Sequence, residues 1–158
     1  MVDVVRINKN ELSKIVIDIY DNDFENVSKI HKLNVDKSLT NVEKIVAYAL
    51  DTMASIDENE VICKLETEGK VVGFFTLSNK YNITQLNGFH IDKANRTKKV
   101  LKAFWDSIEN SSLPKLICGL YEENKQAINH LKKNGFQEQE YLYVDKYEKN
   151  FLILNKTR

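Results

Sequence analysis

Hydrophobic residues in the first 55 positions mostly follow helical spacing. A short β-branched run, Val4–Ile7, predicts a first strand, and Asn10 is the expected cap of the helix that follows. Thr40 and Glu43 have the spacing of a capping box, in which the hydroxyl and the carboxylate each accept a hydrogen bond from a main-chain amide. The predicted helices have apolar faces made of Leu12, Ile15, Val16 and Ile19, then Phe24, Val27 and Ile30, then Val42, Ile45, Val46, Ala49, Leu50 and Met53.

The hydrophobic period changes to that of strands after residue 60. Val61–Leu65 and Val71–Leu77 are separated by Glu68-Gly69-Lys70, which predicts a hairpin with glycine in its turn. The polar segment Ser78–Lys80 is expected to separate this hairpin from a third strand over Gln85–Ile91.

A strand over 115–120 and a helix capped by Asn124 come next. The helix is expected to end at Asn134-Gly135-Phe136, where glycine suits the left-handed conformation after a helix terminus. Tyr141–Val144 and Phe151–Leu154 predict a closing antiparallel pair.

Helical spacing also returns over 97–110, between the strands at 85–91 and 115–120. Its buried face is expected to comprise Leu101, Phe104, Trp105 and Ile108, and its exposed face Lys98, Lys102, Asp106 and Glu109. The order of elements predicts an α+β fold in one domain over 1–158. A central mixed, mostly antiparallel sheet of about seven strands carries about four helices on its faces, and the strands flanking 97–110 are parallel.

Composition narrows the function classes. The 158 residues include 23 Lys plus Arg and 23 Asp plus Glu, so the formal net charge is zero and no nucleic-acid partner is expected. Cys63 and Cys118 lie in apolar runs without metal-type spacing, which favours buried thiols in a reducing cytoplasm and no metal site. The sequence has neither an apolar run of about 18 residues nor a signal-peptide core, so a cytoplasmic protein without a membrane partner is expected.

Two segments, Phe89–Leu101 and Asn124–Phe136, carry a resemblance to a known family. The first resembles the fourth strand, pyrophosphate loop and third helix of the GNAT (Gcn5-related N-acetyltransferase) superfamily. The second is similar to the fourth helix of that family, with its N-x-x-A start and G-F end, and it is the more specific of the two. The order of elements extends the resemblance over nearly the whole chain.

The loop pattern of the family is R/Q-x-x-G-x-G/A, and here it reads Arg96-Thr97-Lys98-Lys99-Val100-Leu101. Arg96 matches, but Lys99 and Leu101 replace the two small residues that let a pyrophosphate approach helix amides. The charges of Lys98 and Lys99 could replace some of the amide contacts to the pyrophosphate. The alternative is that this segment is a solvated basic turn that binds no phosphate. The resemblance implies acetyl-CoA, or another acyl-CoA, bound by Phe89, Ile91, Arg96, Thr97, Lys98, Lys99, Val100, Asn124 and Ala127.

The catalytic tyrosine of the family corresponds to Leu131, which cannot donate a proton. Tyr121, at the end of a strand, is the best-placed substitute acid, and His90 is a candidate base with the alternative of a structural strand histidine. His130 is expected to face solvent. Gly88 suggests a strand bulge of the kind that separates strands around the cofactor.

The resemblance implies an acyl-CoA-dependent N-acyltransferase that moves an acetyl group directly to an amine of a small molecule or peptide. The alternative is a catalytically inactive GNAT-like protein, of phage origin, that acts as a binding or structural module. Loss of the loop glycines and of the tyrosine favours this alternative, and the abundance of Asn and Lys fits an AT-rich genome. A homodimer is compatible with either interpretation.

Overall fold

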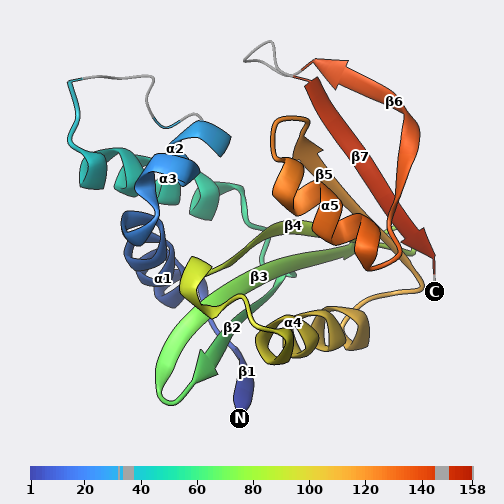
Figure 1. The fold of residues 1–158 in the computed structure, drawn as a ribbon, viewed down its shortest axis with the longest axis horizontal. Helices are drawn as coiled ribbons and strands as arrows, with labels where there is room; N and C mark the ends of the chain where they lie inside the picture. Colours follow the sequence, from blue (N-terminus) through green and yellow to red (C-terminus); the bar gives the residue numbers. More distant parts are fainter. Residues whose placement is uncertain (32, 34–37, 145–149, 158) are drawn as a thin grey trace.

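The computed structural model describes residues 1–31, 33, 38–144 and 150–157. Its strands form one sheet in the order β1-β2-β3-β4-β5-β7-β6 (Figure 1). Neighbouring strands are antiparallel except β4 and β5, which are parallel. The strands are β1 (Val2–Arg6), β2 (Val61–Thr67), β3 (Lys70–Lys80), β4 (Ile83–Ile91), β5 (Lys115–Tyr121), β6 (Gln137–Val144) and β7 (Asn150–Thr157). The predicted α+β class and mixed sheet are confirmed.

Helices cover both faces of the sheet and enclose two apolar clusters. The described helices are α1 (Lys9–Asn22), α2 (Phe24–Ile30), α3 (Asn41–Ser55), α4 (Lys98–Asn110) and α5 (Lys125–Lys133), with a 3-10 turn at Lys93–Asn95. Helices α1, α2 and α3 gather on one side of the molecule, whereas α4 and α5 contribute to the other cluster (Figure 1). Helix α4 connects β4 to β5, as predicted for a parallel crossover.

Local sequence explains most helix ends. Thr40 and Glu43 form the predicted capping box, with main-chain contacts of 3.2 and 3.1 Å. At the end of α5, Gly135 has φ of 92° while the amides of Gly135 and Phe136 donate to earlier carbonyls in a Schellman arrangement. The predicted cap Asn10 is wrong: Asn8 caps α1 by accepting from the Glu11 amide at 2.9 Å, so α1 begins before Asn10.

Two tight turns set the register of the central strands. Glu68 and Gly69, both with positive φ, close the predicted β2–β3 hairpin. The expected break at Ser78–Lys80 is wrong, because β3 runs through Lys80 and a second positive-φ pair, Tyr81 and Asn82, makes the turn into β4. Asparagine tolerates this conformation, but tyrosine gives no sequence signal for it.

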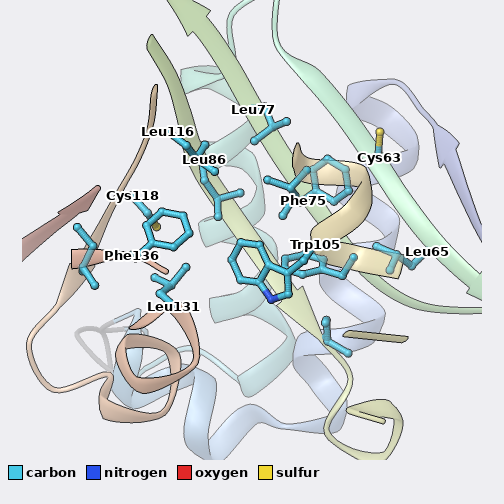
Figure 2. Close-up of a cluster of buried hydrophobic side chains, with 14 of the residues drawn as sticks. Cys63, Leu65, Phe75, Leu77, Leu86, Trp105, Leu116, Cys118, Leu131 and Phe136 are labelled. Atoms are coloured by element: carbon cyan, nitrogen blue, oxygen red, sulfur yellow. The ribbon is translucent and has the colours of Figure 1, made fainter. Parts of the chain in front are cut away.

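The larger apolar cluster lies between the sheet and α4 with α5 (Figure 2). Phe104, Trp105 and Ile108 are buried as predicted, and Leu101 is partly buried at the edge of the cluster. Lys98, Lys102 and Asp106 are exposed, whereas Glu109 is partly covered by an ion pair with Lys156 at 2.5 Å. The rotation of α4 predicted from its spacing is therefore confirmed.

The apolar stripe predicted for α3 is wider than the face that the fold buries. Ile45 and Ala49 have no exposed surface, but Val42 is 49% exposed and Leu50 is 62% exposed. Residues four apart lie along one line of a helix, so Val42 and Leu50 share a line beside the buried one. Ile45 and Ala49 lie in the cluster that α3 shares with α1, with Tyr48 and Met53 packed against it, whereas Val42 and Leu50 lie outside it.

Both cysteines are free and buried, as predicted, and burial raises the pKa of the Cys118 thiol to about 12. The described residues contain no cluster of three His, Cys, Asp or Glu side chains that could hold a metal ion. Within the same residues, each helix is too short or too polar to cross a bilayer.

Candidate active site

The parallel strands β4 and β5 separate partway along their length. Their pairing begins at Ile83 with Lys115 and, in the described residues, ends at Leu86 with Cys118. The rest of β4 still pairs with β3 on its other side. Beyond Leu86, β4 therefore presents a main-chain edge toward β5 that is available for an extended ligand.

A bulge in β4 coincides with this separation. Leu77 pairs with Leu86 and Thr76 pairs with Gly88, so Asn87 is the extra residue on β4. The bulge was predicted at Gly88 and lies one residue earlier, at Asn87. Farther along, the backbones of β3 and β4 approach so closely that a Cβ at Gly73 would lie 2.8 Å from the His90 carbonyl oxygen.

A cavity of about 140 Å³ lies beside the bulge, on the side of the sheet covered by α1 and α3. Its walls combine aromatic and aliphatic side chains with hydroxyls, an imidazole and a carboxylate. The lining residues are Leu12, Val16, Tyr20, His31, Tyr48, Thr52, Ser55, Ile56, Glu60, Phe74, Thr76, Asn87, Gly88 and Phe89. The bulge therefore adjoins both the open edge of β4 and a partly polar cavity.

His90 lies on the same face of the sheet as this cavity. Its ring is edge-on to Tyr20, with 5.3 Å between ring centroids, and it pairs in register with Phe74. Its Nε2 is buried without a hydrogen-bond partner among the described residues. Burial and, to a lesser degree, the Arg96 guanidinium lower the pKa of His90 to about 4, so the imidazole is neutral at pH 7.

His31 forms a second imidazole centre that was not predicted from the sequence. The Tyr48 hydroxyl lies 3.1 Å from its Nδ1 and the Tyr20 hydroxyl 3.4 Å from its Nε2. Burial lowers the pKa of His31 to about 4, with His90 adding to the effect. A neutral imidazole has one donor and one acceptor nitrogen, so one tyrosine donates to His31 and the other accepts from it.

Two of the predicted cofactor-binding residues are already used in holding the start of α4. Thr97 caps the helix by accepting from the Val100 amide at 3.3 Å, so this amide does not point freely at a ligand. Lys98 is exposed at the helix start. The Lys99 side chain lies beside the amino group of Met1 and lowers the pKa of that group.

Arg96 lies between the end of β4 and the start of α4 along the chain. Its Nε donates to the Ile91 carbonyl at 2.9 Å, which holds the side chain against the end of β4. Its guanidinium also contributes to lowering the pKa of His130 on α5, after burial and Lys133. Arg96 thus contributes to lowering the pKa values of both His90 and His130.

The α5 side of the separation contains the other predicted residues. Asn124 is the helix cap, accepting from the Ala127 amide at 3.4 Å, and the Tyr121 carbonyl accepts from the Asn124 amide at 2.9 Å. Leu131, at the position of the family tyrosine, has no exposed surface. The expectation that His130 faces solvent is wrong, because its Nε2 accepts from the Trp105 indole at 2.6 Å. The Trp105 indole belongs to α4, so the sequence pattern of α5 alone does not reveal its contact with His130.

Phe89 and Ile91 direct their side chains into the apolar cluster under α4. The Phe89 ring lies 5.8 Å from that of Phe104, and Ile91 is buried. Any contact of these residues with a ligand in the strand separation therefore involves the main chain of β4.

Comparison with known proteins identifies solved structures but no family. No family model and no curated protein matches the sequence. The ribosomal-protein-S18-alanine N-acetyltransferase of Escherichia coli has a TM-score of 0.67 at 14% identity, covering 99% of this chain and 94% of the other. The PaiA N-acetyltransferase of Thermoplasma acidophilum, in complex with coenzyme A, gives 0.61 at 11% identity over 100% and 99%. A GNAT-family acetyltransferase of Streptococcus pneumoniae gives 0.58 at 17% identity over 99% of each chain.

Proposed function

Because the chain has the fold of the GNAT acetyltransferases, we propose that it is an acyl-CoA-dependent N-acyltransferase that acetylates an amine. The observation that carries this proposal is the separation of β4 from β5 after Leu86, with a bulge at Asn87 and a partly polar cavity beside it. This arrangement supplies an extended main-chain edge for one ligand and a small cavity for another. Coenzyme A bound to the T. acidophilum enzyme supports an acyl-CoA as the co-substrate.

The residues present fit an acyl-CoA in the strand separation. The β4 main chain at Phe89 and Ile91 would hydrogen-bond the extended arm, and Asn124 and Ala127 at the start of α5 would flank it. Arg96 and Lys98 would hold the phosphates at the start of α4, where helix amides and the dipole favour anions. Thr97, Lys99 and Val100 are also predicted to contact the acyl-CoA. The Thr97 hydroxyl and the Val100 amide already bind each other, and Lys99 lies beside the Met1 amino group, so these groups are less available to a ligand.

When bound, the acyl-CoA supplies an activated thioester. The acceptor nitrogen forms a bond to the acyl carbon, the bond from that carbon to sulfur breaks, and the nitrogen loses one proton. His90 is the proposed base, because it is neutral at pH 7 and its Nε2 has no other partner in the described structure. The Tyr121 hydroxyl is the proposed acid that protonates the leaving sulfur.

A Lys98→Ala substitution is expected to weaken acetyl-CoA binding by about 1–2 kcal/mol, the scale of a lost hydrogen bond to a charged group. Lys99→Ala is expected to have a smaller effect, because Lys99 lies beside the Met1 amino group. Lys102→Ala is the matched control, since Lys102 is exposed on the same helix and pairs with Asp106 at 2.5 Å. Isothermal titration calorimetry of the three variants measures the difference. Equal affinities would remove Lys98 from the site.

The proposed function is tested by calorimetry with acetyl-CoA and by thiol release in the presence of amines. Binding with thiol release above the rate of thioester hydrolysis supports an acyltransferase. The absence of binding at millimolar acetyl-CoA would contradict it and would favour the non-catalytic module, for which the bulky Lys99 and Leu101 in the loop are the main argument.

A further inference from the structure

Glu60 brings an unpartnered carboxylate oxygen to the cavity beside the β4 bulge. It lies immediately before β2 and lines the cavity, and its Oε2 is buried without a hydrogen-bond partner among the described residues. Its Oε1 accepts a long contact from the Asp57 amide, at 3.4 Å. A buried carboxylate oxygen without a donor is costly, so this oxygen is best explained as a binding group for a cation or another donor.

Nearby lysines bind other groups. The Lys9 ammonium donates to the Ile56 carbonyl at 2.5 Å, and Lys80 forms an ion pair with Asp57 at 3.2 Å. The polar groups that share the cavity with Glu60 are mainly uncharged at pH 7: hydroxyls, an amide and the neutral His31. Glu60 therefore gives the cavity a negative end.

One strand, β3, lies between the negative end of the cavity and the bulge. Val61, next to Glu60, pairs with Leu77, and Leu77 pairs with Leu86, next to Asn87. Two strand spacings place the main chain at Glu60 about 10 Å from the main chain at the bulge. A ligand that makes polar contacts at both ends of the cavity must therefore carry two functional groups.

A single nitrogen cannot serve both ends in acyl transfer. A carboxylate stabilises the protonated, cationic form of an amine, whereas attack on a thioester needs the neutral form. We propose that the acyl acceptor is a compact diamine, with one ammonium held by Glu60 and the other nitrogen acylated at the β4 bulge. This inference rests on the proposed acyl transfer for the role of the second nitrogen.

The walls between the two ends suit a short methylene chain. Leu12, Val16 and Ile56 supply aliphatic surface, while the Tyr20 and Phe74 rings supply apolar faces that also attract cations. The volume of about 140 Å³ is that of a small molecule, since an engineered cavity of about 150 Å³ holds benzene. A four-carbon diamine is therefore the probe of choice.

The first test measures binding of 1,4-diaminobutane by calorimetry without acetyl-CoA. Glu60→Gln keeps the shape of the side chain and removes its charge, and it is expected to weaken binding about tenfold or more. Glu58→Gln is the matched control, because Glu58 is an exposed carboxylate in the same loop that does not line the cavity. A thermal melt of Glu60→Gln confirms folding, and the Tm is expected not to fall, because one oxygen of Glu60 is already buried without a partner among the described residues.

The second test compares kcat/KM for 1,4-diaminobutane and butylamine with saturating acetyl-CoA. The wild type is expected to prefer the diamine about tenfold or more, and Glu60→Gln is expected to bring the ratio of the two kcat/KM values to about one. Equal use of both amines by the wild type, or an equal loss in Glu58→Gln, would overturn the role of Glu60. Calorimetry with acetyl-CoA separates the two failures: a protein that binds acetyl-CoA but not the diamine contradicts only the diamine proposal.

Discussion

A Phe104→Ala variant is expected to lose about 3–5 kcal/mol of unfolding free energy, as other Phe-to-Ala changes in cores do. Phe104 has no exposed surface. Its ring contacts Phe75, Phe89 and Trp105, with centroid distances of 5.8, 5.8 and 5.0 Å. Because β3, β4 and α4 all contribute to this contact, neighbouring side chains cannot readily fill the cavity that the substitution would leave.

Urea unfolding at pH 7 measures this loss. Lys102→Ala is again the control, and an exposed change of this kind is expected to alter the unfolding free energy by no more than about 0.5 kcal/mol. A loss below about 1 kcal/mol for Phe104→Ala, the scale of ordinary surface changes, would be incompatible with the observed rotation of α4.

The protein is also expected to lose stability as the pH falls from about 6.5 to about 4. The pKa values of His31 and His90 are both lowered from 6.5 to about 4, mainly by burial. Between these values the unfolded chain binds protons that the folded chain does not, so unfolding becomes more favourable as the pH falls. The unfolding free energy is therefore expected to be highest above pH 6.5. Between pH 6.5 and pH 4 it is expected to fall by up to about 3 kcal/mol for each histidine.

Urea unfolding at several pH values between 4 and 7 tests this dependence. The unfolding free energy is expected to change by about 1.4 kcal/mol per pH unit for each proton taken up. His90→Gln removes one titrating group and is expected to reduce the slope by about one proton, while His31 and His130, whose pKa values are also lowered, contribute to what remains. A slope that is the same in His90→Gln and the wild type would show that His90 is not buried in its neutral form.

The strand separation connects these packing features to the proposed chemistry. Phe104 supports the side of β4 that carries Phe89, while Tyr20 covers the opposite side at His90. The main chain of β4 is thus held between two apolar layers while its edge toward β5 stays available beyond Leu86. Rigid support of this kind is what a site for positioned acyl transfer requires.

Several features of the molecule were predictable because short-range forces determine them. The capping box at Thr40 and Glu43 and the left-handed Gly135 each depend on residues close in sequence. The buried face of α4 follows from spacing alone, because its apolar residues form one narrow stripe. The motifs at Arg96 and Asn124 likewise lie in continuous segments, so the position of the candidate site could be predicted together with the fold.

Other features were decided by contacts between distant segments. The sequence does not distinguish Val42 and Leu50 from the buried Ile45, because the packing of α3 against α1 and the rest of its cluster determines which line of the helix is covered. His130 reads as a surface residue until Trp105 is packed against it. The cavity joins Tyr20, His31, Tyr48 and Glu60, which come from separate parts of the chain and match no local motif. By itself, the sequence determined most of the elements and their order, and the family resemblance it carries predicts where an acyl-CoA would bind. Tertiary packing decided the burial and pKa of the histidines and formed the cavity beside the bulge, because these depend on side chains that only the folded sheet and helices bring together.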